Sequence, residues 1–226
     1  EGVRVLGDPN AAARKYVKDG ADELLYIDAV ASLYGRNSIS RILKITSNEI
    51  FIPITASGGI RSVEDAKELI MAGADKIAIN TAGLKDPKLI KNLVETFGSQ
   101  CVVISIQARR RFGEKSWEAM TEMGREKSGK DALDWIKEVQ EIGVGEILLT
   151  SVDQDGTLKN PDFELIKKAS VLTKIPLIVC GGLTKTSDIK SVLENDSVSG
   201  IALGASLHYE KQKIRLIKDS LKNKKI

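Results

Sequence analysis

Histidine and cysteine are scarce in this sequence, which contains one histidine, His208, and two cysteines, Cys101 and Cys180, among 226 residues. Both cysteines lie inside apolar stretches of strand length. A nucleophilic cysteine needs a basic partner, and a single histidine leaves little scope for one, so packing is the better interpretation for both thiols. Two buried, unpaired thiols fit a reducing cytoplasm better than a disulfide framework, and we therefore expect a cytoplasmic protein.

Long hydrophobic runs and an excess of one charge are also missing. No stretch approaches the roughly 18 consecutive apolar residues that a membrane-spanning helix needs, and the sequence does not open on a secretion signal. The 34 basic and 31 acidic residues are interleaved and give a net charge of +3, which is too balanced for a nucleic-acid-binding surface. The densest basic run, 109–111, lacks a repeated pattern of stacking aromatics. We expect neither a nucleic-acid nor a membrane partner.

Short apolar stretches, mostly β-branched, recur along the chain, and each is followed by an amphipathic segment. The expected strands are 24–29, 52–57, 76–80, 101–107, 146–152, 176–181 and 199–206. The expected helices begin at Asp8–Pro9 and after Ser62, and otherwise cover 38–47, 87–97, 130–142, 162–173, 185–194 and 209–222. Continuously apolar strands that alternate with helices are typical of the α/β class. The sequence therefore predicts a (β/α)8 TIM barrel in which residues 1–226 form a single domain.

The pattern gives eight helices but only seven strands. A barrel that lacks one strand would leave two edges unpaired, so we expect a first strand before or around Glu1 that is missing from this sequence. The polar segment 109–130, which contains three glycines, follows the fifth strand of the expected barrel. Loops of this length are often functional covers, and we expect a mobile one here.

The two halves of the chain resemble each other at a constant spacing of 123 residues, which indicates half-barrel duplication: IPITASGG at 52–59 matches IPLIVCGG at 175–182. A Gly-Gly pair lets the backbone approach an anion closely, and the next strand of each half ends in a small polar turn at a helix N-terminus. One such pair alone would indicate only a tight turn, but two matched pairs favour phosphate binding. The predicted phosphate-binding residues are Gly58, Gly59, Asn80 and Thr81 in the first half, and Gly181, Gly182, Gly204, Ala205 and Ser206 in the second. The arrangement predicts a ligand with a phosphate at each end.

From about Gly7 to Ser206 the chain resembles the cyclase subunit of imidazole glycerol phosphate synthase, from histidine biosynthesis. The resemblance rests on GDP (7–9), DGADELLYIDAVAS (19–32), GGIRSVEDAKELIMAGADKIAINTA (58–82), FGSQCVV (97–103), GVGEILLTSVDQDGT (143–157) and CGG (180–182). It implies ammonia-dependent cleavage and ring closure of a bis-phosphorylated ribulosyl aminoimidazole-carboxamide intermediate, a lyase-type reaction. It further implies a heterodimer with a glutaminase subunit that supplies the ammonia, and no metal or organic cofactor.

Three charged residues, Glu23, Lys76 and Glu146, each stand at the start of an expected strand. Buried charges are costly unless paired, so we expect them to form salt bridges at the bottom of the barrel. The resemblance implies that this cluster gates ammonia entry, together with an arginine on the first strand that the sequence does not show. Simple stability of the bottom face is an equally good interpretation. The resemblance also implies that Asp75 contacts the glutaminase.

The resemblance implies two catalytic aspartates, on strands 1 and 5. At the strand-5 position this chain carries Gln107, which can hydrogen-bond but cannot act as an acid or base. Further candidates for the reaction are Asp28, Thr150 and Asp155 at strand ends, although an Asp-Gly pair such as 155–156 is also typical of turns. Asp153 lies nearby, and His208 is better explained by packing or a surface position.

An alternative is a relative of the cyclase that channels ammonia for amidotransfer to cell-surface sugars with weak or no cyclase activity. Gln107, Ser57 in place of a third glycine, Leu183–Thr184 after the second glycine pair, and the divergent segment 109–130 favour this alternative. An unpartnered isomerase of the same pathway is a third possibility, which the gate residues and Asp75 disfavour.

Overall fold

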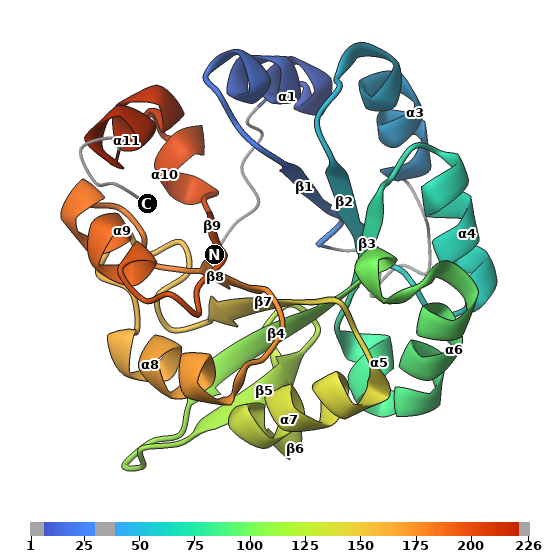
Figure 1. Cartoon of the computed structure of the whole chain (residues 1–226), viewed down its shortest axis with the longest axis vertical. Helices are drawn as coiled ribbons and strands as arrows, with labels where there is room; N and C mark the ends of the chain where they lie inside the picture. The colour runs from blue at the N-terminus through green and yellow to red at the C-terminus, as the bar shows by residue number, and fades with distance from the viewer. Residues whose placement is uncertain (1–6, 30–38, 222–226) are drawn as a thin grey trace.

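The structure is a computed structural model that describes residues 7–29 and 39–221. Its parallel strands follow one another in the order β1-β2-β3-β4-β7-β8-β9 and curl into a sheet with helices around the outside (Figure 1). These strands are β1 Leu24–Ile27, β2 Ile54–Ser57, β3 Lys76–Ile79, β4 Val102–Arg110, β7 Glu146–Ser151, β8 Leu177–Cys180 and β9 Gly200–Ala202. Each of the seven strands expected over 24–206 is present, and the α/β barrel class is confirmed.

The helices follow the expected pattern, and local signals in the sequence explain where they begin and end. They are α1 Pro9–Lys18, α3 Ile39–Glu49, α4 Val63–Met71, α5 Thr81–Lys85, α6 Pro87–Phe97, α7 Ala132–Ile142, α8 Phe163–Leu172, α9 Thr186–Leu193, α10 Ala205–His208 and α11 Ile214–Leu221. The carboxylate of Asp8 accepts hydrogen bonds from the first turn of α1, and Ser62 and Asp65 cap α4 reciprocally. Gly20, Gly73 and Gly143 follow helices with positive φ, as expected for glycines at helix C-termini.

Alternating residues of each strand face opposite sides of the curled sheet, because side chains along a strand alternate with a period of two. One set packs outward against the helices in the main core, for example Ile77, Ile104 and Leu149. The other set forms a separate cluster, which includes Ala78 and Leu148. This second set lies on the inner face, so residues two positions before or after its members in a strand also face the interior of the barrel.

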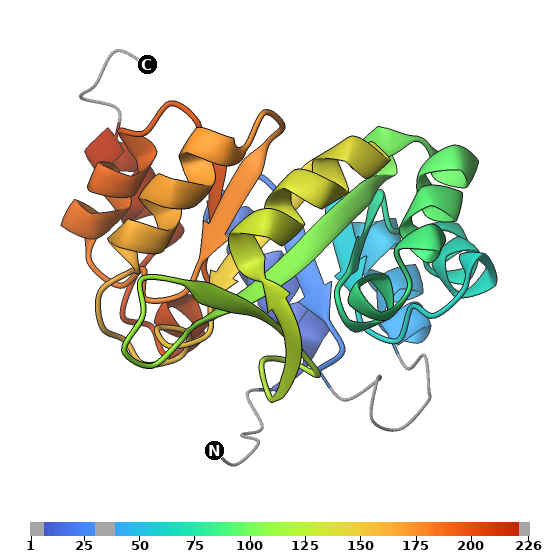
Figure 2. The same cartoon turned by 90° about the horizontal axis from the view of Figure 1, so that it is seen from below.

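The segment expected to be a mobile cover forms a β-hairpin, so the expectation of a long connection without secondary structure was wrong. β5 (Trp117–Thr121) pairs antiparallel with the long end of β4, and β6 (Glu126–Asp131) pairs with β5. Figure 2 shows the hairpin extending the sheet at one end of the molecule. It is anchored by Trp117, whose side chain is fully buried.

The C-terminal part of the chain differs from the expectation in two places. β9 ends at Ala202 and α10 begins at Ala205, so the strand expected over 199–206 is much shorter. Residues 209–213 are not helical, and the last described helix, α11, starts only at Ile214. A positive φ at Glu210 breaks the helical path between α10 and α11.

β1 and β9 form the two ends of the sheet, and within 7–29 and 39–221 no strand pairs with their outer edges. The expected first strand would lie between them, but residues 1–6 are outside the described part of the chain. None of the helices in the described ranges is both long and apolar enough to cross a membrane.

Candidate functional site

The phosphate-binding residues predicted in the first half of the chain meet at one cavity of about 250 Å³. Gly58 and Gly59 follow β2, Asn80 and Thr81 follow β3, and Asp28 lies beside them after β1. Parallel strands end at the same edge of a sheet, so these turns come together at the C-terminal ends of the strands. Asn80 precedes α5 without capping it through its side chain, which leaves the first N–H groups of that helix available to a ligand.

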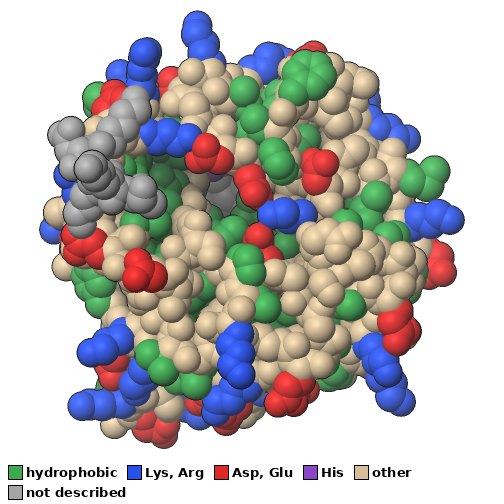
Figure 3. Space-filling view, in the orientation of Figure 1, with side chains coloured by type: hydrophobic (Ala, Val, Ile, Leu, Met, Phe, Trp, Pro, Cys, Tyr) green, Lys and Arg blue, Asp and Glu red, His purple; other side chains and the backbone are tan. Residues whose placement is uncertain are grey.

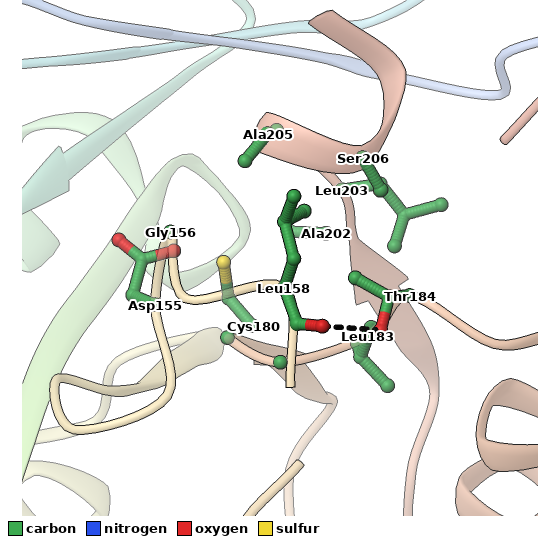
Figure 4. A pocket seen from close by; sticks show the side chains of 13 residues that line it. Asp155, Gly156, Leu158, Cys180, Leu183, Thr184, Ala202, Leu203, Ala205 and Ser206 are labelled. Carbon is green, nitrogen blue, oxygen red and sulfur yellow. Dashed lines mark hydrogen bonds between the residues drawn. The ribbon is translucent and has the colours of Figure 1, made fainter. Parts of the chain in front are cut away.

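The predicted residues of the second half also meet, at a cavity of only about 20 Å³. It is lined by Gly181 and Gly182 after β8 and by 204–206 after β9. Figure 4 shows the side chain of Leu158 lying among these residues. The hydroxyl of Thr184 donates hydrogen bonds to the carbonyl oxygens of Leu158 (3.4 Å) and Lys159 (2.8 Å) and holds this loop in place.

The two halves match in backbone conformation as well as in sequence. The φ angles of the first pair, Gly58 and Gly59, are 108° and 73°, and those of Gly181 and Gly182 are 98° and 74°. A side chain is excluded at both first positions, because an added Cβ would lie 2.4 Å from the Asp28 carbonyl oxygen at Gly58 and 2.7 Å from the Ser151 carbonyl oxygen at Gly181. Glycine is therefore needed at both positions, because the backbone of a neighbouring strand end passes too close to leave room for a side chain.

Gln107, Thr150 and Cys180 lie side by side on adjacent strands, at the inner face near the C-terminal ends. The Gln107 side chain is buried, its Nε2 donates to the Met123 sulfur at 3.4 Å, and its Oε1 has no hydrogen-bond partner among the described residues. Burial raises the pKa of Cys180 to about 12, with the nearby Asp155 carboxylate adding to the effect. The Cys180 thiol therefore stays protonated, which agrees with the packing role expected for it.

The candidate aspartates have different surroundings. Asp28 lines the first cavity and Asp155 the second. Asp155 is exposed as a residue, but its carboxyl group is partly covered in the cavity wall, and this burial raises its pKa although the Gly156 N–H acts in the opposite direction. Asp153 accepts a hydrogen bond from the Arg110 N–H at 2.8 Å, so its carboxylate anchors the end of β4 rather than facing either cavity.

The three charged residues at the strand starts form the expected cluster. Lys76 donates hydrogen bonds to Glu146 at 2.9 Å and to Glu23 at 3.0 Å. Burial alone would lower the pKa of Lys76, but its bonds to the two carboxylates outweigh burial and raise the pKa, so the lysine stays charged. In the space-filling view, basic and acidic side chains lie next to one another around the hollow in the middle of the ring (Figure 3).

The side chains of Asp75 and Ser57 form hydrogen bonds with backbone groups. Asp75 accepts a hydrogen bond from the Ile54 N–H at 2.8 Å, and the Ser57 hydroxyl donates to the Ala78 carbonyl oxygen at 2.9 Å. Both therefore stabilise the pairing of β2 with β3. His208 lines neither cavity; its Nδ1 lies 2.6 Å from the Tyr16 hydroxyl and links α10 to α1.

Several residues at the two cavities could not be identified from the sequence. Arg61, Lys85, Glu122 and Met123 line the first cavity, and Leu158 fills the second. Glu122 and Met123 belong to the hairpin that was expected to be an irregular cover, and its pairing with β4 is what brings them to the cavity. Among the described residues, no three histidine, cysteine, aspartate or glutamate side chains come together as a potential metal site.

The chain is similar to known proteins along most of its length. The profile of a family described as "Histidine biosynthesis protein" matches residues 1–213. The chain is 54% identical over 188 residues to the imidazole glycerol phosphate synthase subunit HisF of Legionella pneumophila, covering 83% of this chain and 88% of that protein. It is 40% identical to the protein of the same name from Clostridium botulinum, over 97% of this chain and 87% of the relative. It is also 40% identical to the one from Dictyoglomus turgidum, over 99% of this chain and 88% of the relative.

Proposed function

The chain belongs to the HisF family of imidazole glycerol phosphate synthase subunits, and we propose that it is a cyclase of histidine biosynthesis. In this proposal it uses ammonia to cleave and cyclise a bis-phosphorylated ribulosyl aminoimidazole-carboxamide, and imidazole glycerol phosphate is released. The reaction takes place at the C-terminal ends of the strands, in the cytoplasm.

The observation that carries this proposal is the pair of matched glycine turns at one edge of the sheet. Backbone N–H groups of Gly58 and Gly59 would bind one phosphate, and those of Gly181 and Gly182 the other. The second site has the same backbone but little free volume, so a phosphate binds there when the Leu158 side chain moves aside. Two such sites select a substrate that is phosphorylated at both ends.

The residues between the two sites would handle the reacting part of the substrate. Asp155 is suited to proton transfer, because its raised pKa brings it closer to neutral pH. Asp28 would act from the opposite side of the barrel mouth, and Thr150 would orient the substrate by hydrogen bonding. Gln107 can position a substrate group but cannot exchange a proton with it.

Ammonia would enter at the opposite end of the barrel from a glutaminase subunit. The relatives are named as subunits of a synthase. The ion-paired cluster of Lys76, Glu23 and Glu146 lies at the N-terminal ends of the strands, the end that such a partner would cover. In this proposal the cluster gates ammonia and Asp75, which is exposed beside it, contacts the glutaminase.

The proposal is tested by incubating the purified chain with the bis-phosphorylated substrate and ammonium, and by separating the products chromatographically. We expect imidazole glycerol phosphate to form above the level of a heat-inactivated control. If substrate binds but no product forms at any ammonium concentration, the chain is not a cyclase.

A second candidate is an ammonia-channelling relative that serves amidotransfer to cell-surface sugars. The observation that favours it is Gln107, a buried amide that contacts the Met123 sulfur at the position where the resemblance implies a catalytic carboxylate. For this candidate we expect stimulation of a glutaminase partner without turnover of the bis-phosphorylated substrate, so the same assay with the partner added separates the two.

A further inference from the structure

The tip of the β5–β6 hairpin carries a buried carboxylate, Glu122, to which the proposed reaction gives no role. Glu122 is only 9% exposed and lines the first cavity. Its Oε1 lies 3.6 Å from the Nζ of Lys85, an exposed lysine that offers only a weak, solvent-screened ion pair. Its Oε2 is buried and has no hydrogen-bond partner among the described residues.

The backbone of the hairpin tip holds Glu122 in this position at a conformational cost. Glu122 and Met123 both have positive φ, 48° and 57°, which is unfavourable for residues with side chains. The Glu122 N–H donates a hydrogen bond to the Thr81 hydroxyl at 3.0 Å and fastens the tip to the first cavity. Strained backbone of this kind is typical of functional sites.

A second side chain of the same cavity also lacks partners. Both the Oδ1 and the Nδ2 of Asn80 are buried without a hydrogen bond to any described residue, and Asn80 lines the cavity beside Glu122. Buried polar atoms without partners are costly and rare in folded proteins. Donors and acceptors on a ligand would satisfy these atoms.

We propose that Glu122 is a specificity-determining residue that accepts a hydrogen bond from a hydroxyl group next to the phosphate of the bound ligand. A carboxylate can only accept hydrogen bonds, and it repels a nearby phosphate unless a donor lies between them. The cavity therefore selects a phosphate ester with hydroxyl groups on its carbon chain over an ester without them. This inference rests on the proposed function only in that a phosphate ester occupies the first cavity.

The test compares glycerol 1-phosphate with propyl phosphate, which has the same three-carbon chain without hydroxyls, and with inorganic phosphate. Binding to the full chain is followed through the backbone amide NMR signals of Thr81 and Glu122, which report on the first cavity alone. We expect glycerol 1-phosphate to bind about tenfold more tightly than propyl phosphate, as is typical of one hydrogen bond to a charged group.

The variant Glu122→Met removes the carboxylate and keeps a side chain of similar length. We expect it to bind the two esters with affinities within about twofold of each other and to bind propyl phosphate more tightly than the unaltered chain does. Glu122→Gln retains a weaker acceptor and should keep part of the preference, which a merely misfolded hairpin would not. Glu126→Gln changes an exposed glutamate of the same hairpin and should keep all of it.

Equal binding of the two esters by the unaltered chain, or an unchanged preference in Glu122→Met, would overturn the inference while leaving phosphate binding intact. If none of the three compounds moves the Thr81 signal, the phosphate site of the proposed function fails as well. The two failures are therefore distinguishable in a single titration.

Discussion

Single glycines at the strand ends determine whether the two proposed phosphate sites can form. At Gly181 a Cβ would meet the Ser151 carbonyl oxygen at 2.7 Å, and the φ of +98° already disfavours any side chain. Gly156 in the neighbouring loop also has positive φ, +69°, but an added Cβ would find open space there. Substitutions at Gly181 and Gly156 therefore separate the energetic cost of a steric clash from the cost of a positive φ.

We predict that Gly181→Ala lowers the free energy of unfolding by about 2–4 kcal/mol, because strain and a backbone clash add together, whereas Gly156→Ala costs only about 1–2 kcal/mol from strain. Urea denaturation measures both. Gly181→Ala should also weaken phosphate binding at 204–206, monitored by the amide signals of those residues, and leave the Thr81 signal responsive. Equal stability losses in the two variants would show that the close contact at Gly181 is relieved at little cost.

At the scale of elements, one aspartate joins the hairpin to α8. Asp162 accepts hydrogen bonds from Arg110 at 3.0 Å, from the Trp117 indole N–H at 2.9 Å and from the Leu165 N–H at the start of α8. The Arg110 guanidinium in turn lies 4.4 Å from the centre of the Trp117 ring. The base of the hairpin is thus held by several bonds to a single carboxylate.

We predict that Asp162→Ala destabilises the protein by about 2–4 kcal/mol, because it leaves the buried indole N–H and the partly buried guanidinium without their acceptor and removes a helix cap. Glu164→Ala is the matched control, since it removes a more exposed partner of the same arginine and should destabilise the protein much less than Asp162→Ala does, because solvent screens an exposed ion pair. Thermal or urea unfolding compares the two. Similar losses in both variants would mean that the hairpin is held mainly by its strand pairing.

The link between α10 and α1 should make stability depend weakly on pH. Partial burial lowers the pKa of His208 below its ordinary value of 6.5, so protonation is less favourable in the folded chain than in the unfolded one. The contribution of the neutral ring is therefore complete above pH 6.5 and is lost as the pH falls through the lowered folded-state pKa.

We predict a shallow decrease in the free energy of unfolding between pH 7.5 and pH 5 that is smaller in His208→Asn, whose side chain can still bond Tyr16 but does not titrate. Urea denaturation across this range gives the difference between the two proteins. Identical pH profiles would show that solvent reaches the ring and cancels the effect of burial.

The sequence predicts the elements well where its signals are local. The buried parallel strands are apolar throughout, and residues 54–57 and 177–180 follow proline and precede paired glycines, so their positions were evident. The β5–β6 hairpin was missed because β6 is polar and largely exposed and owes its strand conformation to pairing with β5. The helix predicted over 209–222 begins too early. The chain leaves the helical conformation at Glu210 through a positive φ, which glutamate seldom adopts, so the sequence does not reveal the interruption.

At the scale of the whole molecule, the duplicated sequence predicts which residues of each half meet at a site, and the structure brings these residues together. What duplication cannot predict is how the halves differ. The second cavity is small because the Leu158 side chain fills it, whereas the first cavity is open and carries the buried carboxylate of Glu122. Both residues lie in connections outside the repeated motifs.

The two ends of the barrel should also be coupled through the charged cluster. Lys76 is 19% exposed at its side chain and neutralises Glu146, which is 13% exposed. In Lys76→Met the two glutamates face each other without a cation, so they repel and rearrange at the entrance where ammonia would pass. The proposed substrate site should not change, because it lies at the other end of the strands.

We therefore predict that Lys76→Met lowers turnover driven by glutamine and the glutaminase subunit by about five- to tenfold, the lower end of typical coupling between distant sites. Turnover driven by saturating free ammonium should change by less than about twofold, since ammonium in solution can reach the active site from the other face. Lys67→Met, which alters an exposed lysine of α4, should change neither rate. If Lys76→Met lowers both rates equally, the cluster stabilises the bottom of the barrel rather than gating ammonia.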